Sequence, residues 1–440
     1  MKLRTLLIQL RSSLWFLPTL IVFGSGTLAA VFIELDSRLS LKLLTNFPRL
    51  FGAGAEGSRA MLSSIAGSMI TVAGVTFSIT IVALSQASSQ YSSRILRNFM
   101  RDRGNQTVLG VFLGVFTYCL LVLRSIRGGD ESPFVPSLSV FGALVLALVG
   151  ISFLIFFIHH VASLLQASNV IAAAAHETLE TIDRLFPESV HDNRSVPEAE
   201  PESDDWLEQE RQIIIPAPKT GYIQSHEEKA FFELACSSQS VFRMHVGVGE
   251  FAVFDTPLVT VYSSSSVTEK LVKNIQATYS INALRTIEQD AGFGIRQIVD
   301  IALKALSPGV NDTTTAVTCI DYLTAINLRL ANRRMTQRLL FENGWLRVIA
   351  KAAGFEQFVG ESFDEIRACA AGNATLIMSL LHSLKTIGAA TDDPSRKFLI
   401  ARHISLLEDL TSKTIDSDYD AARIKRALDS SDSVYSMDHG

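Results

Sequence analysis

The densest group of side chains that could do chemistry lies in RTIEQDAGFGIRQIVDIALKALSPGVND, residues 285–312. It combines guanidinium, carboxylate and amide groups: Arg285, Glu288, Asp290, Arg296, Asp300, Asn311 and Asp312. Arg296 and Asp300 stand four residues apart, so they share a face of a helix. The cluster predicts either a helix hairpin held by ion pairs and N-cap bonds, or a ligand pocket. In the pocket, two arginines and the helix N-terminus after Asp312 would receive an anion.

Nothing in the chain has the spacing of a familiar catalytic site. The sequence contains no GxxxxGK[ST] loop, no GxSxG elbow and no HExxH helix. The histidines of the second half occur singly, and the four cysteines lack CxxC or Cys/His spacing: Cys119, Cys236, Cys319 and Cys369. We therefore expect no enzyme, no cofactor and no metal site.

A second chemical feature is the stretch SSIAGSMITVAGVTFSITIVALSQASSQYSS, residues 63–93, which has no charged residue but many hydroxyls. Alternating steps of four and three follow one face of a helix, because a turn takes about 3.6 residues. From Ala60, these steps reach Ser64, Gly67, Thr71, Gly74, Ser78, Ile81, Ser85, Ser88 and Ser92. Only Ile81 is large and apolar. We call this row the small-polar seam.

Two interpretations of the seam stay open. Small residues let membrane helices approach closely, so the seam could be a packing surface within the bundle. In a symmetric oligomer the same residues would present hydroxyls to water and ions along a central axis. The pore-lining residues would then be Ser64, Gly67, Thr71, Gly74, Ser78 and Ser85.

The composition indicates a membrane protein with a soluble part. Of 440 residues, 48% are hydrophobic and only 19% are charged, and the mean hydropathy is +0.27. The net charge of −5 provides no general basic field, so we expect no nucleic-acid partner.

Uncharged intervals predict four membrane-spanning helices. They lie at about 14–33, between Arg59 and Arg94, at about 107–123, and between Glu131 and Glu177. No Gly or Pro stands between Gly150 and Pro187. We therefore expect the fourth span to be one helix that crosses the membrane and projects beyond it. The histidine pair His159–His160 is the only ionisable group expected within the spans. Passive conduction or a scaffold is therefore favoured over active transport.

Basic residues cluster before the first span and between the second and third, at Arg94, Arg97, Arg101 and Arg103. The other loops mix basic residues with acids such as Asp36 and Glu56. The positive-inside rule then favours cytoplasmic N- and C-termini in an inner membrane.

The composition changes after the spans. Residues 1–186 form the predicted transmembrane domain, 187–212 an acidic linker, 213–264 a small β module, 265–430 a helical domain and 431–440 a flexible tail. The expected fold class is membrane α-helical with a cytosolic α+β part.

Three stretches carry a family resemblance: residues 63–102, TGYIQ with GVGEFAVFDTPL, and RTIEQDAGFGIRQIVDIALKALSPGVNDTTTAVTCIDYL. Together they resemble a family of predicted bacterial inner-membrane proteins catalogued as a domain of unknown function. The resemblance implies the order of four spans, β module and helical region, and it implies no reaction. The β module also resembles half of a barrel-sandwich hybrid pattern, so we expect a barrel-sandwich-like module.

The residues themselves must therefore carry the functional expectation. We expect a homo-oligomeric ion channel in the inner membrane, with a cytosolic regulatory domain. Its partners would be the lipid bilayer, other copies of the chain and inorganic ions. The alternative is a non-conducting scaffold or sensor whose helical domain binds a ligand or partner.

Overall fold

The computed structural model describes residues 15–46, 54–90, 102–127, 134–164, 166–187, 211–335 and 339–430. Contacts divide the chain into two compact units, Met1–Asn169 and Val170–Gly440. Most of the predicted linker and the whole predicted tail lie outside the described residues.

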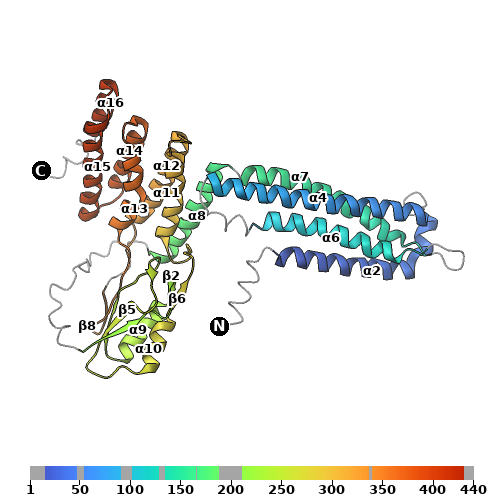
Figure 1. Ribbon diagram of the computed structural model, residues 1–440, viewed down its shortest axis with the longest axis horizontal. Helices are drawn as coiled ribbons and strands as arrows, with labels where there is room; N and C mark the ends of the chain where they lie inside the picture. Colours follow the sequence, from blue (N-terminus) through green and yellow to red (C-terminus); the bar gives the residue numbers. More distant parts are fainter. Residues whose placement is uncertain are drawn as a thin grey trace. The chain divides into compact units, whose positions relative to one another are not determined.

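Four long helices form the first unit and run alongside one another (Figure 1). They are α2 (Phe16–Asn46), α4 (Ala55–Gln90), α6 (Arg103–Ser125) and α7 (Ser137–Leu164). Each contains a segment long and apolar enough to cross a membrane, so the four predicted apolar helices are confirmed. Helix α6 is the most enclosed of the four and packs against all three others.

Glycines on α6 allow α2 to approach closely. A Cβ atom built on Gly110 would lie 2.7 Å from Ile21 Cδ1, and one on Gly114 would lie 2.5 Å from Ser25 Oγ. Neither contact is possible for a larger residue without movement, so these positions fix the distance between the two helices.

The first helix is longer than the predicted span and carries a buried acid. Helix α2 continues to Asn46, so Asp36 lies on the helix instead of in the external loop. Its carboxylate is fully buried and accepts bonds from Leu138 N at 2.9 Å, Ser139 N at 2.8 Å and Ser139 Oγ at 2.6 Å. It thereby caps the first turn of α7 from another helix.

The fourth span and its expected projection beyond the membrane are two helices and not the single helix that was predicted. Helix α7 ends at Leu164, and α8 spans Ala167–Leu185. The side-chain amide of Asn169 donates to the Ser163 carbonyl at 2.8 Å, and Gln166 N donates to the same oxygen at 3.3 Å. A side chain that satisfies a helix-end carbonyl can end a helix without Gly or Pro.

The second unit contains two small sheets (Figure 1). The first has the order β1 (Gln212–Pro216), β5 (Pro257–Tyr262), β3 (Val241–Met244), β8 (Trp345–Ile349) and β7 (Leu339–Glu342), with only β3 and β8 parallel. The second is antiparallel, in the order β4 (Phe251–Ala252), β2 (Gly221–His226) and β6 (Tyr279–Asn282). Helices α9 (Glu228–Ser237) and α10 (Glu269–Ala277) accompany them. The α+β part is thus confirmed, and the barrel-sandwich-like arrangement stays a prediction.

The remaining helices are α11 (Ala291–Ala305), α12 (Thr313–Ala331), α13 (Phe355–Cys369), α14 (Ala374–Ala389), α15 (Pro394–Thr414) and α16 (Asp418–Asp429). Within the range 265–430, Tyr279–Asn282 forms strand β6 and pairs with β2, and helix α11 begins only at Ala291. Strands β6, β7 and β8 all come from the range 265–430, which was predicted to be helical.

Candidate functional site: the exposed face of α4

The described seam residues of α4 share one exposed face. Ser64, Gly67, Thr71, Gly74, Ser78 and Ser85 are all exposed within the chain. The opposite face is buried and is made by Leu62, Ala66, Met69 and Ala73. At about 100° per residue, the centre of the seam lies nearly opposite that packed face. The side chain of Ser88 and all of Ser92 lie outside the described part of the chain.

The glycines of the seam have no neighbours among the described residues outside their own helix. A Cβ atom built on Gly67 or Gly74 would meet nothing within 4 Å. By contrast, a Cβ on Gly110 or Gly114 of α6 would collide with α2. Packing within one chain therefore explains the glycines of α6, but it does not explain those of the seam.

Two hydroxyls on or beside the seam bond to their own helix. Thr71 Oγ1 donates to the Gly67 carbonyl at 2.8 Å, and Ser68 Oγ donates to the Ser64 carbonyl at 2.8 Å. Such bonds satisfy the hydroxyl donor in an apolar medium, and they leave oxygen lone pairs on the surface. The face can therefore contact hydrocarbon, another helix or water.

The polar cluster of the second unit is divided among separate places. At the start of α11, Arg285 Nε donates to Asp290 Oδ2 at 2.9 Å, and the Arg285 guanidinium lies 5.2 Å from the Phe293 ring centre. Asp290 also caps α11 by accepting from Phe293 N at 3.0 Å. Burial raises the pKa of Asp290, and Arg285 opposes that rise.

The next pair joins α11 to α13. Arg296 Nε donates to Asp300 Oδ1 at 2.7 Å, and Arg296 Nη1 pairs with Glu365. The bond from Arg296 lowers the pKa of Glu365, and the same bond raises the pKa of Arg296. Both arginines of the cluster thus form ion pairs with carboxylates of the same chain, an arrangement typical of a structural element.

The other predicted cluster residues have local roles. Asp312 caps α12 by accepting from Thr315 N at 3.0 Å and Thr315 Oγ1 at 2.6 Å, which lowers its pKa. Asn311 precedes it with a positive φ of 49°. Glu288 is exposed, and its carbonyl accepts from Arg184. The structure therefore does not bring Asn311 and Asp312 together with Arg285 in one pocket.

A hydrogen bond that joins α7 to the N-terminus of α6 was missed from the sequence. His160 Nε2 lies 2.5 Å from Asp102 Oδ2, and Asp102 caps α6 through Gly104 N and Asn105 N. A Cβ on Gly104 would come 2.6 Å from the His160 ring. The Asp–x–Gly sequence before an uncharged run is a readable N-cap signal, whereas the histidine partner is 58 residues away.

Among the described residues, no group of three or more His, Cys, Asp or Glu side chains could hold a metal ion.

His226 provides a pH-dependent test of the second unit. Its ring is 7% exposed, packs on Phe231 and Tyr279, and leaves Nε2 without a hydrogen-bond partner. Burial lowers its pKa from 6.5 to about 4. The unfolded chain therefore binds more protons than the folded chain between these pH values. The contribution of neutral His226 to the free energy of unfolding is fully present above pH 6.5 and is lost as the pH falls toward 4.

A shift of this size corresponds to about 3 kcal/mol. We expect His226→Phe to flatten the decline in melting temperature of the second unit over this pH range. The matched control is His382→Phe, which changes an exposed histidine. An unchanged pH profile in His226→Phe would contradict the assignment.

Comparison with known proteins gives the chain a family but no activity. The model of a family described as "Predicted membrane protein (DUF2254)" matches residues 11–386. Uncharacterised proteins of Mycobacterium bovis and Mycobacterium tuberculosis are each 29% identical over 435 residues, covering 96% of this chain and 80% of theirs. No solved structure matches the chain. Because the family model covers most of its length, the chain belongs to this family of predicted membrane proteins.

Proposed function

We propose that the protein is a homo-oligomeric membrane channel in which the seams of several α4 helices line a polar axis. The observation that carries the proposal is the pair of glycines, Gly67 and Gly74, which are exposed and meet no other helix in the part of the chain that the structure describes. A row of small and hydroxyl-bearing residues that faces only lipid makes few stabilising contacts. The same row between copies would allow close approach and would supply oxygen atoms to water and ions.

The length of α4 supports an aqueous axis. The helix has 36 residues, so it is about 54 Å long at 1.5 Å per residue, well beyond a hydrocarbon core of about 30 Å. The seam reaches Ser85 among the described side chains, near the far end of the helix. Its residues carry no charge, so conduction would be passive and would not depend on a charged ring at the seam.

The proposal includes the cellular arrangement. The basic residues before α2 and between α4 and α6 favour an inner membrane with both termini in the cytoplasm. The unit Val170–Gly440, with its predicted barrel-sandwich-like module, would then be cytosolic and would regulate or assemble the channel.

A second candidate is a non-conducting scaffold or sensor in which copies pack dry along the seam. It is favoured by the bond from Thr71 Oγ1 to the Gly67 carbonyl, because a hydroxyl satisfied within its own helix needs no water. In this case the second unit would bind the ligand or partner.

Flux through reconstituted vesicles distinguishes the two candidates. We expect the purified full chain to conduct salt ions, and we expect Thr71→Leu and Ser78→Leu to reduce the flux at least tenfold, because Leu fills the axis with hydrocarbon. The control Val75→Leu adds bulk at an exposed position beside the seam and should leave most of the flux. An unchanged oligomer by size-exclusion chromatography with light scattering must accompany the block. A stable oligomer without flux under varied salts, pH and voltage would favour the scaffold.

A further inference from the structure

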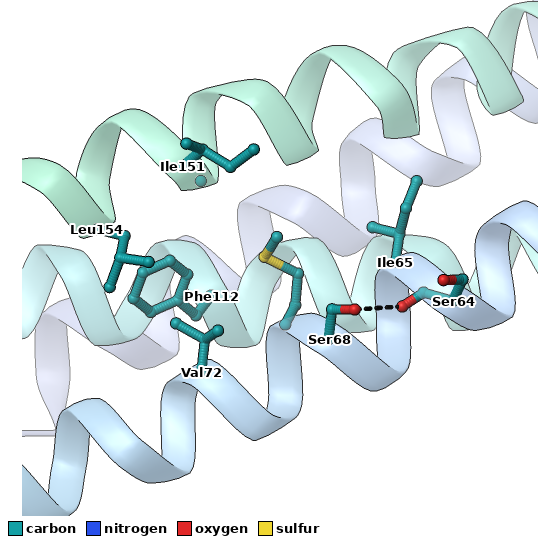
Figure 2. A pocket seen from close by; sticks show the side chains of 9 residues that line it. Ser64, Ile65, Ser68, Val72, Phe112, Ile151 and Leu154 are labelled. Atoms are coloured by element: carbon teal, nitrogen blue, oxygen red, sulfur yellow. Dashed lines mark hydrogen bonds between the residues drawn. The ribbon is translucent and has the colours of Figure 1, made fainter.

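A groove of about 300 Å³ lies between α4, α6 and α7 in the first unit (Figure 2). Its floor contains the buried side chains of Met69 and Phe112. Ile65 and Val72 border it on α4, and Leu154 borders it on α7.

A glycine contributes to this space. Gly150 of α7 faces Met69, and a Cβ atom there would lie 3.2 Å from the Met69 sulfur and 3.9 Å from Phe112. A larger residue at this position would have to displace Met69 or fill part of the groove. The absence of a side chain thus keeps the floor accessible.

The groove lies deep within the spans. Phe112 is 9 residues after Arg103 and 13 residues before Ser125, the two ends of α6. At a rise of 1.5 Å per residue, this is about 13 Å from the nearer end, close to the middle of a hydrocarbon core of about 30 Å. The medium available at this depth is the hydrocarbon of lipid tails.

The chemistry of the lining also selects an apolar occupant. None of its residues is charged, and the hydroxyl of Ser68 already donates to the Ser64 carbonyl. The groove lies on the flank of α4 marked by Ile65 and Val72, roughly 130° around the helix from the centre of the seam. Ser64 belongs both to the seam and to the lining, so the groove adjoins the seam there, whereas Ile65 and Val72 face away from a copy packed along the seam.

We infer that the groove binds one linear acyl chain of a bilayer lipid, held between α4 and α7 over Phe112. An occupied groove recovers the dispersion contacts that its lining would otherwise lack. The inference goes beyond conduction and does not rest on it, because it requires only that the three helices lie in a bilayer.

Photocrosslinking in vesicles tests this site. The full chain is reconstituted in phosphatidylcholine that carries a diazirine on one palmitoyl chain, and adducts are mapped by mass spectrometry. We expect adducts to concentrate on the α4 and α7 residues that border the groove. We expect Ser68→Phe, which fills the groove, to lower these adducts about tenfold, the effect of losing roughly 1.4 kcal/mol of binding free energy.

Two further variants keep the test decisive. Ile151→Phe fills the groove from α7 and should act like Ser68→Phe, whereas Leu148→Phe adds the same ring at an exposed α7 position outside the lining. Adducts on the exposed Ile155 and Ile158 should be the same in all variants. Adducts spread evenly over the exposed apolar residues, or groove adducts that persist in both filling variants, would overturn the inference.

Discussion

Replacing Gly294 with alanine is expected to unfold the second unit at a much lower temperature. Gly294 lies in α11 where α8 crosses it, and a Cβ atom there would come 2.0 Å from Thr178 Oγ1 and 2.9 Å from Thr178 Cβ. Both are far below contact distance, so one helix must move away from the other. Overpacking of this kind costs about 3 kcal/mol or more.

The sign of the change in stability distinguishes a steric clash from a gain in helix propensity. Within a helix, replacing Gly by Ala normally stabilises by about 1 kcal/mol through propensity alone. Gly309→Ala, in the turn between α11 and α12, is the control for an added methyl group without a clash, because a Cβ at Gly309 meets nothing within 4 Å. Thermal unfolding in detergent, followed by circular dichroism, should show a large drop for Gly294→Ala only. Equal melting temperatures for the two variants would contradict the close crossing of α8 and α11.

Removing the carboxylate of Asp36 is expected to destabilise the first unit. Asp36→Ala leaves Leu138 N, Ser139 N and Ser139 Oγ without their acceptor at a fully buried position. Lost capping and unsatisfied buried donors together cost about 3 kcal/mol. The Tyr118 hydroxyl, which donates to the Ser139 carbonyl at 2.9 Å, should become more mobile.

The control for this variant lies two residues away. Glu34→Ala removes an exposed pair with Arg38, and exposed pairs contribute little. Resistance to unfolding in mixed detergent micelles should fall for Asp36→Ala and should hardly change for Glu34→Ala. Equal resistance would mean that the cap on α7 is not a stabilising contact.

Local signals in the sequence were sufficient to predict many of the helices. Uncharged intervals of span length identified α2, α4, α6 and α7 because the bilayer imposes length and composition together. The turn SPGVND indicated Asn311 or Asp312 as the N-cap of the following helix, and Asp312 has that role in α12. The Asn343–Gly344 pair, with positive φ at both residues, is also a readable hairpin signal for β7–β8, but it was overlooked.

Contacts between distant residues could not be predicted in this way. Asp36 is 103 residues from Ser139, and its role depends on how α2 packs beside α7. The break between α7 and α8 depends on the Asn169 side chain, which carries no Gly or Pro signal. The helical spacing of small and polar residues was enough to identify the seam. Its exposure could not be predicted, because it depends on which face of α4 packs on α6 and α7.

The measurement closest to the central claim is flux through vesicles containing Ser78→Cys, before and after a charged, membrane-impermeant thiol reagent. The background replaces the four native cysteines by serine or alanine. If the seam lines an aqueous axis, the reagent should reach residue 78 and block most of the flux, whereas Ile79→Cys on another exposed flank should not react. Flux that continues with residue 78 fully modified, or an oligomer that carries no flux, would contradict the proposed channel.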